Sequence, residues 1–128
     1  MAETQELMEA REEVEAMMAR ARAAQEQIAD YTQEQVDQLI TAMVWAVARE
    51  DRSEEIAQFT VEETQLGNYA GKYLKIHRKT RATLMDIIDD KSVGVIEEDP
   101  ERNIVKIAKP VGVIGALSPS TNPEATPV

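Results

Sequence analysis

A short polar run near the end of the chain carries the residues best suited to chemistry. The run Ser118-Pro119-Ser120-Thr121-Asn122-Pro123 follows directly on an apolar stretch over 111–117. The amide of Asn122 can donate its NH₂ to a developing oxyanion, and the neighbouring hydroxyls can line a polar cradle. The same residue types also make ordinary turns. Spacing alone therefore favours a turn, and a chemical role needs independent support.

Other residues that often take part in chemistry give weaker signals. His77 is the only histidine and lies in a basic cluster from Lys75 to Lys79, which favours a solvated basic face over catalysis. The adjacent carboxylates of 97–99 are typical of a solvated turn, so we predict no metal site. Gly112 and Gly115 form no G-x-G-x-x-G pattern, so the usual phosphate-binding fingerprint is missing.

Composition narrows the class of protein. The chain has 128 residues, 43% of them hydrophobic, which allows one domain with a core. Its 24 acidic and 14 basic residues give a net charge of -10, which argues against nucleic acid and anionic membranes as partners. The absence of cysteine excludes a disulfide, a thiolate zinc site and a cysteine nucleophile within this chain.

The chain carries no sign of a membrane span or a signal peptide. No apolar run approaches the roughly 20 residues that cross a bilayer. The first residues are acidic and lack a basic segment followed by an apolar one. We therefore expect a cytoplasmic protein.

The sequence predicts helices over most of the chain before residue 90, and these helices must position the polar run. Apolar residues recur at threes and fours from Leu7 to Ile28, which predicts an amphipathic helix with a thin apolar stripe. Thr32 with Gln35 predicts a capping box, and a strongly periodic helix over 36–47 follows it. Within that helix, Met43 and Trp45 are expected in the core.

Two further helices are expected before the pattern changes. Asp51 with Glu54 predicts a second cap, and the helix after it should turn Ile56, Phe59 and Thr60 inward. Gly67 is a natural C-terminal stop. Apolar spacing predicts a last helix from Tyr69 to about Asp89.

After Lys91 the pattern indicates strands. Val93–Ile96 and Ile104–Ala108 flank turn-forming residues at 99–103, which predicts a β-hairpin. The run 111–117 is apolar throughout, as in a strand buried on both faces of a parallel sheet. This chain offers no second strand of that kind. We therefore expect the rest of the sheet to lie beyond residue 128 or on another chain.

Four stretches in order resemble the CoA-acylating branch of the aldehyde dehydrogenase family. They are 109–123 (KPVGVIGALSPSTNP), 21–40, 61–72 and 93–108, and together they cover nearly the whole chain after about residue 18. The resemblance implies an α/β fold of which this chain is the N-terminal portion. The visible part would be mainly helical, with a β-hairpin and the first strand of the cofactor-binding sheet. The implied parts are a helical segment at 1–92, a hairpin like an oligomerisation arm at 93–109, and the truncated start of an NAD-binding domain at 110–128.

The resemblance also implies a reaction. In this family a cysteine thiolate attacks an aldehyde, a hydride passes to NAD, and coenzyme A takes the acyl group from the thioester. Asn122 matches the asparagine that stabilises the oxyanion. The residues that match the loop against the nicotinamide side are Leu117, Ser118, Pro119, Ser120, Thr121 and Asn122. The nucleophile and the CoA region would lie in later sequence, so this chain alone should be inactive.

One departure from the family pattern and two alternatives follow from the sequence. Gln65 stands where the family usually has a glycine. The aldehyde is acetaldehyde, propionaldehyde or sulfoacetaldehyde, and the ending 122–127 looks slightly more like sulfoacetaldehyde enzymes. The alternative function is a non-catalytic helical module that docks on a partner through its hairpin.

Overall fold

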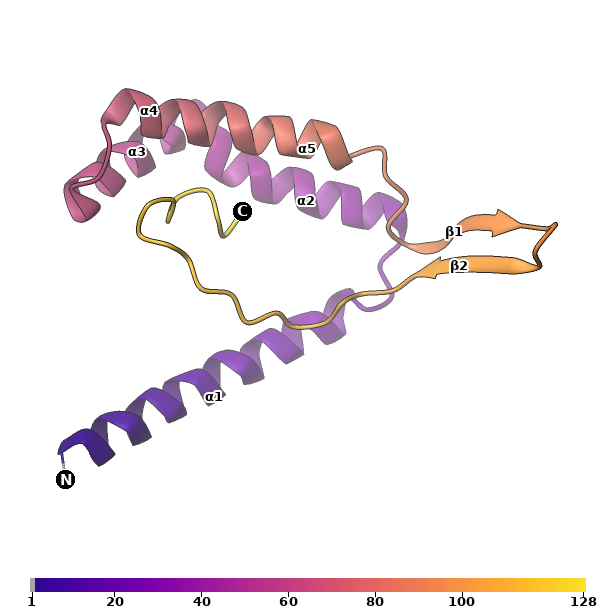
Figure 1. Cartoon of the computed structure of the whole chain (residues 1–128), viewed down its shortest axis with the longest axis horizontal. Helices are drawn as coiled ribbons and strands as arrows, with labels where there is room; N and C mark the ends of the chain where they lie inside the picture. Colours follow the sequence, from indigo (N-terminus) through magenta and orange to yellow (C-terminus); the bar gives the residue numbers. More distant parts are fainter. Residues whose placement is uncertain (1) are drawn as a thin grey trace.

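A computed structural model describes residues 2–128, with side chains from residue 4 onward, as a series of helices, one hairpin and an irregular C-terminal segment (Figure 1). The elements are α1 (Ala2–Ile28), α2 (Gln33–Ala48), α3 (Glu50–Thr64), α4 (Tyr69–Leu74), η1 (Lys75–Thr80), α5 (Arg81–Ile87), β1 (Gly94–Asp99) and β2 (Ile104–Ala108). The predicted helices and hairpin are therefore confirmed. Helices α2 to α5 lie together, and α1 lies apart from them. The hairpin projects from the end of the helical body where α5 ends and α2 begins.

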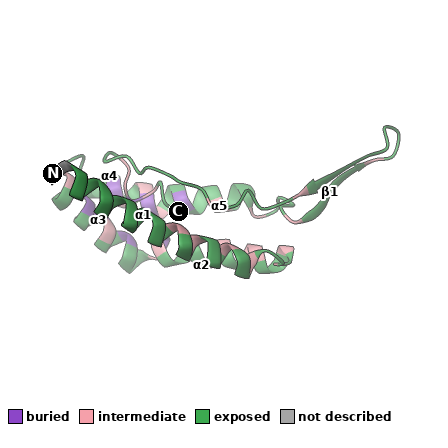
Figure 2. Cartoon of the chain, turned by 90° about the horizontal axis from the view of Figure 1, so that it is seen from below, coloured by how far each residue is buried: buried purple, intermediate pink, exposed green. Residues whose placement is uncertain are grey.

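Helix α1 has the thin apolar stripe that its sequence predicts, and the stripe is exposed (Figure 2). Leu7 is 66% exposed and Val14 is 56% exposed. An amphipathic helix gains most of its stability by burying its apolar face. The described chain does not provide that cover for α1.

The capping box of α2 is confirmed, but the predicted cap of α3 is wrong. The Thr32 hydroxyl accepts from the Gln35 amide at 3.3 Å, and the Gln35 side chain accepts from the Thr32 amide at 2.9 Å. Helix α3 instead begins after Arg49, with no side-chain hydrogen bond at the cap, and Asp51 lies within its first turn. Only Arg49 separates the two helices, so the chain turns before Asp51 can occupy the cap position.

The stop of α3 also differs from the prediction. The helix ends at Thr64, and Gln65 takes the left-handed conformation with φ 55°. Gly67, the predicted stop, has φ 79° two residues later. The left-handed residue that ends the helix is therefore the one at which the family usually has glycine.

The last predicted helix is continuous but changes its winding in the middle. Helices α4 and α5 adopt α geometry, whereas η1 between them is a π-helix of six residues. Short π segments inside helices often accompany functional sites. Nothing in the apolar spacing of this region predicted the π-helix.

The core is small and is built from small residues. The buried side chains are Ala48, Ser53, Ala57, Thr60 and Ile76, together with Lys72, Thr80 and Glu124. The face of α3 over 53, 57 and 60 packs inward, and Ser53 donates to the Val47 carbonyl at 3.2 Å.

Thr60 is buried as predicted, but three core predictions are wrong. Phe59 is 62% exposed, Trp45 63% and Met43 46%. Each lies on a helix beside a residue that faces inward, and one residue turns a helix by about 100°. Close packing of small residues therefore decided the inward face.

The hairpin is antiparallel and is fixed to the helices at its base. β1 pairs with β2 from Gly94 opposite Ala108 to Asp99 opposite Ile104, with a bulge between Val95 and Glu97. Before it, the Gln33 side chain of α2 accepts from the amides of Ser92 and Val93 at 2.8 and 3.0 Å and donates to Asp90 O at 3.3 Å. This arrangement holds the hairpin at a defined end of the helical body.

The predicted strand over 111–117 is not formed. Residues 109–119 have no regular structure, and Val111, Ile114 and Leu117 are 88%, 69% and 97% exposed. A strand needs a neighbour to bond to, and no other segment of residues 2–128 lies alongside as one. The cofactor-binding sheet is thus not observed, and the architecture seen is helical with a two-stranded sheet.

The accessible surface of the chain is larger than that of a compact protein of its mass. It measures 10179 Å² for 14.3 kDa. A compact monomer of that mass exposes about 6800 Å². Much of the excess is apolar and lies on α1, the hairpin and residues 111–117.

Candidate functional site

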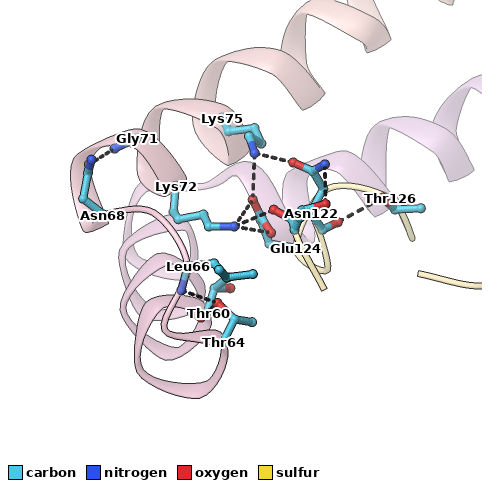
Figure 3. Close-up of polar contacts among 11 residues, drawn as sticks. Thr60, Thr64, Leu66, Asn68, Gly71, Lys72, Lys75, Asn122, Glu124 and Thr126 are labelled. Carbon is cyan, nitrogen blue, oxygen red and sulfur yellow. Dashed lines mark hydrogen bonds and ion pairs between the residues drawn. The ribbon is translucent and has the colours of Figure 1, made fainter. Parts of the chain in front are cut away.

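Residues 121–124, at the end of the polar run, contact α4 and η1 (Figure 3). Backbone hydrogen bonds form two turns here, one before and one after Asn122. Asn122 N donates to Pro119 O at 3.2 Å. Asn122 O accepts from the amide and the hydroxyl of Thr126 at 3.2 and 2.9 Å. The turn expected from composition is therefore present, and it fixes the backbone of Asn122 from both sides.

Lys72 of α4 fastens this run to the helices. Its Nζ donates to Thr121 O at 2.7 Å and lies 3.4 Å from Glu124 Oε1. The Lys72 side chain is 5% exposed and that of Glu124 is 0% exposed. Charges this deeply buried are stable only when they are paired. Breaking the pair would therefore release the loop from the helix.

Lys75, in the first turn of η1, reaches the same carboxylate and also Asn122. Its Nζ lies 3.6 Å from Glu124 Oε1 and donates to Asn122 Oδ1. Glu124 Oε1 accepts no hydrogen bond of good geometry, so its compensation is electrostatic and comes from two ammonium groups. The centre holds two positive charges against one negative charge.

The contact with Lys75 fixes which way the Asn122 amide faces. An ammonium group has donors only, so the atom beside it must be the oxygen. The nitrogen, Nδ2, therefore points the other way and donates to Thr121 Oγ1 at 3.3 Å. This is a long, exposed bond, so Nδ2 is available as a donor to another group.

The residues predicted to face a cofactor lie around this centre but form no pocket of their own. Asn122 is half-buried, and the others are exposed: Leu117, Ser118, Pro119, Ser120 and Thr121. Exposed hydroxyls and an outward amide are suitable for lying against one face of a planar ring. They would form only part of a dinucleotide site.

Sequence reasoning missed Lys72, Lys75 and Glu124. Two lysines three residues apart on a helix lie on one face, and Glu124 is the only carboxylate after Glu101. Those were the available signals. Because the partners are 47 to 52 residues apart in sequence, no local pattern joins them.

His77 lies on a different face from this centre. It stacks on Tyr73 with ring centroids 5.2 Å apart and shares a hydrogen bond with Arg81 at 3.2 Å. Desolvation, and after it the Glu54 carboxylate, raises the pKa of the neighbouring Tyr69 phenol. His77 is half-buried, so the solvated basic face that we predicted is only partly correct. Within the described residues, no group of three or more His, Asp or Glu side chains could hold a metal ion.

The chain is similar over most of its length to aldehyde dehydrogenases, two of which are named as acylating or acetylating. It is 48% identical over 108 residues to a sulfoacetaldehyde dehydrogenase of an Acholeplasma species, covering 84% of this chain and 22% of that protein. It is 45% identical to an acylating sulfoacetaldehyde dehydrogenase of Cupriavidus necator, over 92% of this chain and 24% of that protein. It is 43% identical to an acetylating succinate-semialdehyde dehydrogenase of Clostridium kluyveri, over 90% of this chain and 25% of that protein. No family model matches the chain.

These matches confirm the predicted resemblance. The chain is a relative of the acylating aldehyde dehydrogenases, and it spans about a quarter of the length of the three relatives named. Two of the three are sulfoacetaldehyde dehydrogenases by name. The alternative of a non-catalytic docking module gains no support. None of the described helices is both long and apolar enough to span a membrane.

Proposed function

We propose that the whole protein oxidises a short aldehyde to its acyl-CoA with NAD, and that this segment supplies part of the active site. The observation that carries the proposal is the Asn122 amide, whose Nδ2 faces away from the lysines that hold its oxygen. The similarity to acylating enzymes along most of the segment supports it.

The proposed reaction balances without water. A cysteine thiolate elsewhere in the protein adds to the aldehyde carbon and places a negative charge on the aldehyde oxygen. Bound NAD would supply the acceptor for the hydride that leaves that carbon, and a thioester would remain. The thiol of coenzyme A then takes the acyl group, losing its proton, and the cysteine thiolate is released.

In this reaction Asn122 is the proposed catalytic residue of the chain. Its Nδ2 would donate to the aldehyde oxygen as that oxygen gains charge. A donor held in place before the reaction stabilises the transition state more than the substrate, commonly by about 3 kcal/mol. Leu117 to Thr121 would lie against the nicotinamide side of NAD, and the rest of the NAD site would come from outside this chain.

We propose an aldehyde that carries an anionic group as the substrate. The substrates in the names of the relatives, sulfoacetaldehyde and succinate semialdehyde, share a negatively charged group beside a short carbon chain. The excess positive charge of Lys72 and Lys75 over Glu124 favours an anion near this region.

We further propose that the hairpin pairs with a neighbouring copy of the protein. One face of it carries Val95, Val105 and Ile107, which are 46%, 55% and 57% exposed. A two-stranded hairpin alone in water is barely stable, so a partner on this face would stabilise it.

The cytoplasmic location stays a prediction.

The whole protein tests the proposed function directly. NAD reduction is measured with sulfoacetaldehyde, succinate semialdehyde and acetaldehyde, each with and without coenzyme A. We expect reduction that needs coenzyme A and is fastest with an anionic aldehyde. Equal rates without coenzyme A, with release of the free acid, would show that the acylating assignment is wrong.

A further inference from the structure

The contacts of Asn122 differ from those of the rest of its loop. Lys72 and Glu124 hold the backbone, because Lys72 bonds to the Thr121 carbonyl and pairs with Glu124. Lys75 instead bonds to the Asn122 side chain, donating to Oδ1, while Nδ2 donates to Thr121 Oγ1 at 3.3 Å. The two lysines therefore have separable effects, one on where the loop lies and one on how the amide is turned.

We propose that Lys75 is a positioning residue for the Asn122 amide, acting through the bond from its ammonium group to Asn122 Oδ1. The inference rests on the proposed function and deepens it. Lys75 does not touch the reacting atoms in this picture. It acts by fixing one of the two orientations that an asparagine amide can take.

The physical reason is that the two ends of the amide are nearly equal in shape and opposite in chemistry. Turned over, the amide would present an oxygen to the aldehyde oxygen and would repel the growing charge. A free amide would populate both orientations, whereas the ammonium group accepts only the oxygen as a partner. Pulling electron density toward Oδ1 also makes Nδ2 a better donor, since bonded polar groups polarise one another.

Glu124 keeps Lys75 in place. Its carboxylate lies 3.6 Å from Lys75 Nζ and has a fully buried side chain, whereas the Lys75 side chain is 27% exposed. A flexible lysine would otherwise extend into water and lose the contact. The partly exposed position of Lys75 also means that truncating it leaves space that water can fill. We expect the Lys75 variants to fold.

The test is a double-mutant cycle in the whole protein, with Lys75→Met, Asn122→Ala and the pair combined. We expect Lys75→Met alone to lower kcat by about 10- to 100-fold, as misplacement of a catalytic group commonly does, with KM for NAD nearly unchanged. In the Asn122→Ala background the same change should cost less than about threefold, because its effect passes through Asn122. Lys75→Arg, which keeps a charged donor, should restore most of the rate.

Lys79→Met is the matched control, since Lys79 is an exposed lysine of the same π-helix. It should leave kcat unchanged. Lys75→Gln is run through the same cycle, with folded enzyme counted by NAD binding, so that a poorly folding Met variant does not decide the result. Equal losses in both Asn122 backgrounds, or no loss in either, would overturn the inference. An inactive wild type would instead overturn the proposed function.

Discussion

At the scale of single residues, Glu124 has the most demanding environment in the described chain. Its side chain is fully buried against Lys72 and Lys75, and it comes from a run that is otherwise mostly exposed. Burying the charges of Lys72 and Glu124 has a large desolvation cost, which only the attraction among the three charged groups offsets. The cluster is therefore sensitive to the loss of any one charge.

Glu124→Gln should lower the free energy of unfolding by about 3 kcal/mol or more, because it leaves two ammonium groups without their counter-charge. The control is Glu97→Gln, which removes a carboxylate paired with Lys106 at 2.5 Å where both side chains are more than half exposed. Exposed pairs contribute about 1 kcal/mol at most. Denaturant titration of both variants of the whole protein measures the difference, and similar losses would contradict the buried-cluster description.

Gln65 is the second residue whose conformation has a measurable consequence. Its left-handed backbone strains a residue with a Cβ, and its side chain recovers part of the loss by donating to Glu62 O at 2.6 Å. Glycine adopts the conformation without strain. The left-handed backbone at position 65 therefore explains why the family that the chain resembles usually has glycine there.

Gln65→Gly should raise the free energy of unfolding by about 0.5 to 1 kcal/mol. Gln58→Gly is its control, the same substitution at an exposed position inside α3, where glycine should cost about 1 kcal/mol. Thermal unfolding of the two variants should therefore shift in opposite directions. A loss of stability at position 65 would show that the side-chain bond outweighs the backbone strain.

Prediction from sequence at the residue scale succeeded where the signal was local. The Thr32–Gln35 box depends on two residues three apart, and it formed as expected. Asn122 lies in a turn, also as expected, but its partner Lys75 is 47 residues away and belongs to another element. Contacts of that kind depend on the packing of helices, which apolar spacing does not specify in detail.

At the scale of elements, type and extent were predictable while the inward faces were not. The four predicted helical regions and the hairpin are all present. We predicted that Ile56, Phe59 and Thr60 of α3 face inward. Thr60 is buried and Ile56 is half-buried, but Phe59 is exposed and the small residue Ala57 is buried in its place. The π-helix has no apolar or capping signature that would have revealed it.

The hairpin is the element whose exposed face gives a prediction. Val105→Asp with Ile107→Asp should weaken assembly of the whole protein at least about tenfold in dissociation constant, since each would place a carboxylate in an apolar interface. Glu101→Lys, a change of charge in the exposed turn, should leave assembly unchanged. Analytical ultracentrifugation over a range of concentrations measures both. Unaltered assembly in the double variant would remove the hairpin from the interface.

At the scale of the whole molecule, much of the excess accessible surface lies on α1, the hairpin and the run 111–117. Of these, α1 and the run 111–117 have little cover within the described residues. Their apolar side chains are exposed for different structural reasons. The helix satisfies its own backbone hydrogen bonds, whereas the extended run leaves its amides and carbonyls free to pair with another strand.

Residues 1–128 produced alone should therefore aggregate through the extended run. Replacing Val111, Ile114 and Leu117 together with serine should slow the rise of light scattering severalfold. The same number of serines at Leu7, Val14 and Met17 of α1 should slow it much less. If the two triple variants behave alike, general hydrophobicity rather than the free backbone drives association.

The attachment of the run 109–118 at both of its ends has a kinetic consequence. Gln33 secures the base of the hairpin that precedes the run, and the two lysines secure the turns that follow it. A chain held at both ends has already given up much of the disorder that strand formation normally costs. A neighbouring strand would therefore pair with a run whose ends are already fixed. Loosening either attachment would slow the pairing of the two strands more than it would alter the sheet once formed.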